Sequence, residues 1–123
     1  MKTQNDGLNL LNELKQFTGT LAYTKINPNC LLTDGALYLA EAVGCYWLFD
    51  LFYSHLVTQN YHDNFACLKM CVSNSRALVR ITDGNELVLA SEVIEYTDFL
   101  LDEIVLFACL DKECWVMMLP SEY

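Results

Sequence analysis

The chain has 123 residues, 54% of them hydrophobic, and a formal net charge of -9 at pH 7. This length fits one domain, residues 1–123, with its own core, and the apolar content excludes a disordered chain. The charge is uneven: residues 1–82 hold six acids and six bases, whereas residues 83–123 hold ten acids and Lys112 alone. A surface of one negative sign repels nucleic acid and membrane phosphate and attracts basic partners.

The first predicted element is a helix that begins with Asp6 as its cap and ends at Gly19. Its apolar residues recur at helical spacing and indicate one buried stripe with a flanking leucine. They are Leu8, Leu11, Leu14 and Phe17, with Leu10 on the flank. Residues 20–26 alternate weakly and predict a short edge strand, and residues 27–29 predict a turn.

A long helix is predicted over residues 35–57, with Thr33 or Asp34 accepting the free amide hydrogens of its first turn. It is apolar nearly all round, which is typical of a helix central to a core or shared with a second subunit. Gly44 lies in its middle, where glycine costs about 1 kcal/mol relative to alanine. A close helix crossing or a break into two helices would explain this glycine. Because one small sheet cannot easily cover so apolar a helix, the sequence predicts a homodimer.

The hydrophobic period changes from helical to alternating at Phe65. Strands are predicted over residues 65–72, 77–81, 87–90 or 87–94, 104–110 and 114–119, with turns at 74–75 and 82–85 and a loop or single helical turn at 96–99. The last two strands are continuous apolar runs, typical of interior strands covered on both faces. The predicted fold is α+β, with N-terminal helices packed on one face of a C-terminal antiparallel sheet of about five strands. We expect four marker residues to be mostly buried: Trp47, Phe49, Leu106 and Val116.

Six cysteines lie within apolar runs, at positions 30, 45, 67, 71, 109 and 114. No apolar segment follows Met1 to act as a secretory signal, so we expect a cytoplasmic protein with reduced, buried thiols rather than disulfides. The longest uncut apolar stretch, residues 42–49, is far shorter than the ~20 residues of a membrane span.

A group of residues with zinc-binding chemistry falls in one short segment: His55, His62, Asp63, Cys67 and Cys71. A strand places the two thiols on one face but ~13 Å apart, so we expect buried side chains and no metal or other cofactor. No nucleophile elbow or phosphate-binding glycine loop is present, and no catalytic residues are predicted. Seven bases against sixteen acids give no footprint for direct nucleic-acid binding.

Five segments, in this order along nearly the whole chain, together resemble DUF6876, a family of small single-domain proteins of unknown function from bacteria, phages and plasmids. They are FTGT (17–20), TDG with YLAE (33–35 and 38–41), GCYWLFD (44–50), YTDF (96–99) and LPSEY (119–123). The resemblance implies no known catalytic residues. It implies a mobile-element setting, in which small acidic proteins often work by occupying the surface of a host protein.

These observations predict a non-enzymatic acidic binding protein from a phage or other mobile element. It would inhibit a host nucleic-acid-handling or defence complex, in the manner of an anti-CRISPR protein, by occupying a basic surface of a host protein or ribonucleoprotein complex. The alternatives are a homo-oligomeric structural or regulatory bacterial protein and, more remotely, a thiol- or metal-dependent enzyme.

We place the partner-binding site on acids that are close in sequence and flank two aromatic residues, because an aromatic within a charged rim can act as an anchor. These residues are Glu92, Glu95, Tyr96, Asp98, Phe99, Asp102 and Glu103. A second interpretation stays open, in which the acids only keep an apolar protein soluble.

Overall fold

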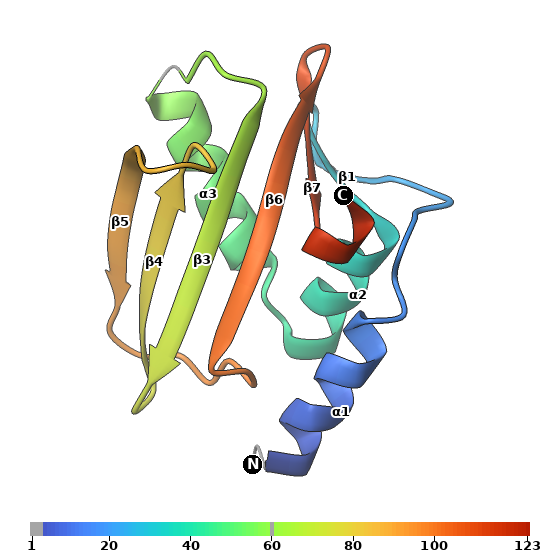
Figure 1. Cartoon of the computed structure of the whole chain (residues 1–123), viewed down its shortest axis with the longest axis vertical. Helices are drawn as coiled ribbons and strands as arrows, with labels where there is room; N and C mark the ends of the chain where they lie inside the picture. Colours follow the sequence, from blue (N-terminus) through green and yellow to red (C-terminus); the bar gives the residue numbers. More distant parts are fainter. Residues whose placement is uncertain (1–3, 60) are drawn as a thin grey trace.

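The computed structural model describes residues 4–59 and 61–123, and within these residues it combines three α-helices with one seven-stranded mixed sheet (Figure 1). The strand order is β1-β2-β7-β6-β3-β4-β5. The elements are α1 Gln4–Leu14, β1 Thr24–Asn27, β2 Cys30–Leu32, α2 Asp34–Val43, α3 Tyr46–Thr58, β3 Phe65–Ser73, β4 Arg76–Thr82, β5 Val88–Ile94, β6 Glu103–Asp111, β7 Cys114–Met118 and a 3-10 turn, η1, Pro120–Glu122. The α+β class is confirmed.

The predicted sheet of about five antiparallel strands is wrong in number: β3 to β7 pair antiparallel as predicted, but they form only part of a seven-stranded mixed sheet. The structure adds β1 and β2, and β2 pairs in parallel with β7, with Leu31 opposite Val116. Only three residues form β2, too few to show an alternating pattern in the sequence. The helices are also not all N-terminal, because α2 and α3 lie between β2 and β3 along the chain.

The long predicted helix is two helices, which resolves the choice that Gly44 left open. Gly44 adopts a left-handed conformation with φ of 65° and donates its N–H to the carbonyl of Ala40, which ends α2. Glycine adopts this conformation without the steric cost that a Cβ brings. At the other end, the Thr33 hydroxyl accepts the N–H of Ala36, as predicted for a cap.

Helix α1 differs from its prediction in bounds and in the face it buries. It begins before Asp6, so this residue is not its cap, and it ends at Leu14. The buried leucines are Leu10 and Leu14, while Leu8 is 55% exposed. Because leucines occur on several sides of this segment, periodicity alone does not decide which side meets the core.

The core lies between the helices and the face of the sheet that they cover; in Figure 1 α3 lies behind β3 and β4. Phe49 and Leu106 are fully buried and Val116 is 9% exposed, as predicted. Trp47 is 36% exposed, so the prediction of a buried tryptophan is wrong. Within the described residues, no helix is long and apolar enough to cross a membrane.

Candidate binding surface on the open face of the sheet

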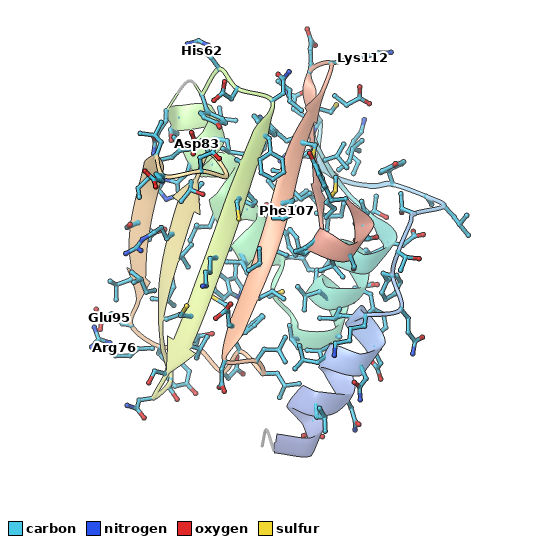
Figure 2. All side chains as sticks on the ribbon, in the orientation of Figure 1. His62, Arg76, Asp83, Glu95, Phe107 and Lys112 are labelled. Atoms are coloured by element: carbon cyan, nitrogen blue, oxygen red, sulfur yellow. The ribbon has the colours of Figure 1, made fainter. Side chains whose placement is uncertain are left out.

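The helices leave the second face of the sheet uncovered, and we call it the open face. Along β3, β4 and β6 every second residue is buried beneath the helices, and the residues between them point to this face. The open face comprises Phe65, Cys67, Lys69 and Cys71 of β3, Arg76, Leu78, Arg80 and Thr82 of β4, Ser91 and Val93 of β5, Glu103, Val105, Phe107 and Cys109 of β6, and Val116 and Met118 of β7. It faces the viewer in Figure 2, with Phe107 near its middle.

This surface corrects the expectation that β6 is covered on both faces, whereas the middle of β7 is buried on both, at Trp115, Val116 and Met117. In the described part of the chain, no helix packs across the open face, and Val105 and Phe107 are only partly buried there. Further out on the same face, Leu78 is 41% exposed and Val93 is 51% exposed. The composition of β6 therefore fits an interior position that the described residues do not provide.

An aromatic cluster occupies one part of the open face. The rings of Phe65, Phe107 and Tyr123 meet edge to face, with centroids 5.1 to 5.4 Å apart. Tyr123 lies outermost and is 74% exposed. A Cβ on Gly84 would lie 2.7 Å from the ring of Phe65, so the turn before β5 packs closely against the cluster. Edge-to-face packing of this kind stabilises a defined arrangement of rings.

Glu122 fastens the C-terminal turn to the beginning of α2. One carboxylate oxygen accepts the hydroxyl of Thr33 at 2.6 Å and the N–H of Leu119 at 3.0 Å. The other oxygen accepts the N–H of Gly35 at 2.9 Å. A carboxylate at the N-terminus of a helix satisfies free amide hydrogens and favours the helix dipole. The contact fixes the position from which Tyr123 extends over the open face.

A hollow of about 370 Å³ lies on the open face between β3 and β4. Its lining combines cations, thiols and turn residues: Cys67, Lys69, Cys71, Leu78, Arg80, Thr82, Gly84 and Asn85. Lys69 and Arg80 lie directly opposite each other in the β3–β4 ladder. Lys69 forms an ion pair with Glu103 at 3.6 Å, whereas Arg80 forms none with any described residue.

The six cysteines occupy different environments, so the expectation of uniformly buried thiols holds only in part. Cys30 and Cys45 are buried in the core, and desolvation raises the pKa of each to about 12. Cys67 lies on the open face, where burial raises its pKa and nearby Lys69 opposes the shift. Cys71 is exposed. The two core thiols are poor nucleophiles at neutral pH because they stay protonated.

The residues with zinc-binding chemistry are dispersed by the fold. Cys67 and Cys71 share the open face, as predicted for a strand, but His55 lies on α3 beyond the other face of the sheet. In residues 4–59 and 61–123, no three His, Cys, Asp or Glu side chains are grouped so as to hold a metal ion.

The predicted partner-binding residues do not form one surface. Phe99 is 2% exposed and lies in the core, so the prediction that it anchors a partner is wrong. Glu92 points to the helix side and lies 3.3 Å from the imidazole of His55. Glu103 lies on the open face beside Lys69. The remaining four, Glu95, Tyr96, Asp98 and Asp102, follow β5 in the segment at the lower end of the sheet.

That lower segment is held by backbone contacts; it buries Thr97, Phe99 and Leu101 and leaves the side chains between them outward. The N–H of Thr97 donates to the carbonyl of Ser75 at 2.7 Å, and the N–H of Val72 donates to the carbonyl of Asp102 at 2.7 Å. Tyr96 is 74% exposed. Figure 2 shows Glu95 beside Arg76, and the two form an ion pair at 3.5 Å. We call the exposed residues Glu95, Tyr96, Asp98 and Asp102 the acidic end.

The open face itself was not predicted from the sequence. The available signal was the outward half of β3 and β4, where Phe65, Cys67, Cys71 and Leu78 stand at positions that a solvated strand fills with polar residues. Strands that carry apolar residues on both faces are typical of sheets that are covered on both faces, so this pattern indicates a second layer over the open face.

The sequence matches the model of a family of unknown function, DUF6876, over residues 8–123. A crystal structure of a protein of unknown function from Enterococcus faecalis is similar, with a TM-score of 0.53 and 14% sequence identity over 80% of this chain and 93% of that chain. At this identity the likeness concerns the fold alone. No curated protein matches the sequence significantly.

Proposed function

The chain belongs to DUF6876, a family of unknown function, and we propose that it is a non-enzymatic protein-binding module whose working surface is the open face of the sheet. One observation carries the proposal: β6, a strand of interior composition, presents an apolar, aromatic face that no α-helix of the described chain covers. Contiguous exposed apolar surface of this kind marks interaction sites in proteins.

The composition of the open face supports a protein partner. The cores of protein interfaces are enriched in aromatic residues, methionine and arginine. Phe107 and Tyr123 supply aromatic surface, Met118 lies opposite Phe107, and Arg80 lies on β4 of the same face. Most of the apolar residues project from strands, so the surface is preformed, and a partner gains contact area with little ordering cost.

The experiment places a charge on the open face without disturbing the core. Val93→Glu introduces a carboxylate at a residue that is 51% exposed on the open face. Val57→Glu is the matched control, because Val57 is 50% exposed but lies on α3. Each protein is tagged and recovered from the natural host. Wild type and Val57→Glu should retain a partner, and Val93→Glu should lose it. Retention by Val93→Glu together with loss by Val57→Glu would move the site to the helix side.

The acidic end is a second candidate surface, favoured by the exposure of Tyr96 among three carboxylates. We propose for it the role that its charge supports, in which the protein occupies a basic surface of a host nucleic-acid-handling or defence complex and inhibits that complex. Charge reversal at Glu95, Asp98 and Asp102 should then abolish binding and leave the melting temperature nearly unchanged. Binding that survives with its salt dependence intact would assign these acids to solvation alone.

A homodimer is the alternative to an external partner, and the exposed helix side offers a surface for it. Tyr46 is 39% exposed and Trp47 is 36% exposed at the beginning of α3. Light scattering at several concentrations tests this directly, because a mass near 14.1 kDa throughout would exclude it.

A further inference from the structure

Two cations face each other near the middle of the open face. Lys69 and Arg80 are direct partners in the antiparallel ladder of β3 and β4. Side chains at such positions start from Cβ atoms only ~4.5–5.5 Å apart, and like charges there are destabilising. The chain has seven Lys and Arg against sixteen Asp and Glu, so two of its few cations lie side by side while acids are plentiful elsewhere. This arrangement costs stability in the free protein.

The surrounding carboxylates do not neutralise the pair. Glu103 lies 3.6 Å from Lys69, but both side chains are more than half exposed, so this ion pair contributes little. Asp83 is the acid next to the hollow in sequence, and its carboxylate accepts the N–H of Asn85 within its own turn. Arg80 has no ion pair or hydrogen bond with any described side chain. Glu103 therefore compensates at most one of the two cations, Lys69 and Arg80, and one positive charge remains without a counter-charge.

The hollow around this charge offers donors to an anion. The guanidinium of Arg80 presents a planar set of N–H groups that matches the two oxygens of a carboxylate. The hydroxyl oxygen of Thr82 accepts the N–H of Gly84 at 3.1 Å, which leaves the hydroxyl hydrogen free to donate. Asn85 adds a polar residue at the turn, and the thiols and Leu78 form the less polar walls.

Covering the open face would remove these cations from water. A charge that is buried without a partner is strongly destabilising, so whatever docks there has to bring an anionic group to this point. On the premise that the open face is the binding surface, we propose that the docked protein segment carries an Asp or Glu side chain, flanked by apolar residues, and that Arg80 and Lys69 receive its carboxylate. The apolar neighbours of that acid would rest on the aromatic cluster, since Phe107 lies one strand away opposite Cys67.

Charge favours this occupant over the other candidates. Two copies packed face to face would bring together four cations from Lys69 and Arg80 and only the two carboxylates of Glu103 in the central part of the face. A nucleic acid would meet the cation pair but also a chain of net charge -9, which repels a polyanion. A single acidic side chain matches the single uncompensated charge.

The test uses a phage-displayed library of random short peptides, selected on the wild-type protein. Peptides that bind the open face are those that lose binding to Leu78→Glu, and we expect an Asp or Glu among apolar residues to recur in them. Kd is then measured for one such peptide and for its counterpart with the carboxylate replaced by an amide. Against wild type the amide should bind about tenfold more weakly or worse, as expected for the loss of a charge-assisted hydrogen bond.

Variants of the protein, measured against both peptides, complete a double-mutant cycle. Arg80→Gln should weaken the acidic peptide about tenfold and leave the amide peptide nearly unchanged, because the two changes remove the same interaction. Arg76→Gln is the matched control, an arginine on the same strand and face that already pairs with Glu95, and it should alter Kd less than about twofold. Arg80→Gln should also raise the urea midpoint of the free protein, because it relieves repulsion with Lys69.

The outcomes separate the two proposals. Peptides that require Leu78 but contain no acid, or an amide peptide that binds as tightly as the acid, would overturn the carboxylate site and leave the binding module standing. A selection in which no peptide depends on the open face would overturn the binding module, and the carboxylate site with it. Analytical ultracentrifugation could instead show that the wild type self-associates and that Arg80→Gln is monomeric. A second copy of the chain would then occupy the open face, and the proposed acidic segment would be overturned.

Discussion

Replacement of Glu122 tests a carboxylate that accepts three hydrogen bonds, from Thr33, Gly35 and Leu119. Glu122→Gln keeps the size of the side chain but leaves one acceptor oxygen and one amide group. If the oxygen stays with Thr33 and Leu119, the new amide faces the N–H of Gly35, which then has no acceptor. If the side-chain amide is rotated by 180°, its NH2 group faces Thr33 and Leu119 instead, and these two donors lose their acceptor. Either orientation loses at least one hydrogen bond to a charged group.

The magnitude follows from these three contacts. A lost hydrogen bond to a charged group costs about 1.5–3 kcal/mol, and loss of the charge at the beginning of α2 adds about 0.3–1 kcal/mol. Thr33 is only 2% exposed, so water does not easily replace the carboxylate. We expect the free energy of unfolding to fall by about 2–4 kcal/mol. With a urea m-value of about 2 kcal/mol/M, in the middle of the usual range, the midpoint should fall by about 1–2 M.

Urea unfolding followed by circular dichroism measures the change, with an unchanged m-value as the check on two-state behaviour. Glu86→Gln is the matched control, since Glu86 is exposed in the turn before β5. A Glu122→Gln midpoint indistinguishable from that of Glu86→Gln would refute the reasoning. It would mean that Gly35 and Thr33 find other acceptors at no cost.

The remaining predictions concern the backbone, the thiols and the core. Gly84→Ala should destabilise more than Gly44→Ala, because both residues have positive φ but only at Gly84 would the new Cβ lie 2.7 Å from a phenyl ring; equal urea midpoints would contradict this. A thiol reagent should modify exposed Cys71 in the native protein and reach Cys30 only on unfolding, which peptide mapping would show. Because burial raises the pKa of Cys30 from 9.0 to about 12, the unfolded chain loses the thiol proton at a lower pH than the folded chain. The contribution of Cys30 to the free energy of unfolding should therefore be constant below pH 9.0 and decline as the pH rises toward 12. If replacing Cys30 with alanine left the loss of stability at alkaline pH unchanged, this prediction would be wrong. Leu106→Ala should cost about 2–5 kcal/mol in urea unfolding, because the side chain is fully buried, and a cost near zero would be inconsistent with its place in the core.

Local patterns predicted the central strands and their turns, because those signals are short-range. The alternation that begins at Phe65 gives β3, and residues 74–75 and 82–85 turn the chain into β4 and then β5, as expected. The break at Gly44 was one of two stated alternatives. In each case the residues that decide the structure are neighbours in sequence.

Features set by distant contacts were missed or misplaced. β2 exists because Leu31 meets Val116, which is distant in the sequence, and no local pattern reports that pairing. Trp47 lies in an apolar segment and Phe99 in an acid-rich one, yet Trp47 is 36% exposed and Phe99 is 2% exposed, because tertiary packing decides burial. The open face was missed for the same reason, since a strand does not encode whether a second layer exists.

The parallel pairing of β2 with β7 has a consequence for the order in which the chain can fold. β3, β4 and β5 are joined by short turns and can form from local contacts. The β1–β2 hairpin has no neighbour in the sheet until β7 is present, and the beginning of α2 lacks Glu122 until the last turn forms. Contacts between sequence-distant segments close late and slowly. On the ribosome, β1, β2 and α2 would therefore stay exposed, without their partner β7, until almost the entire chain has been synthesised.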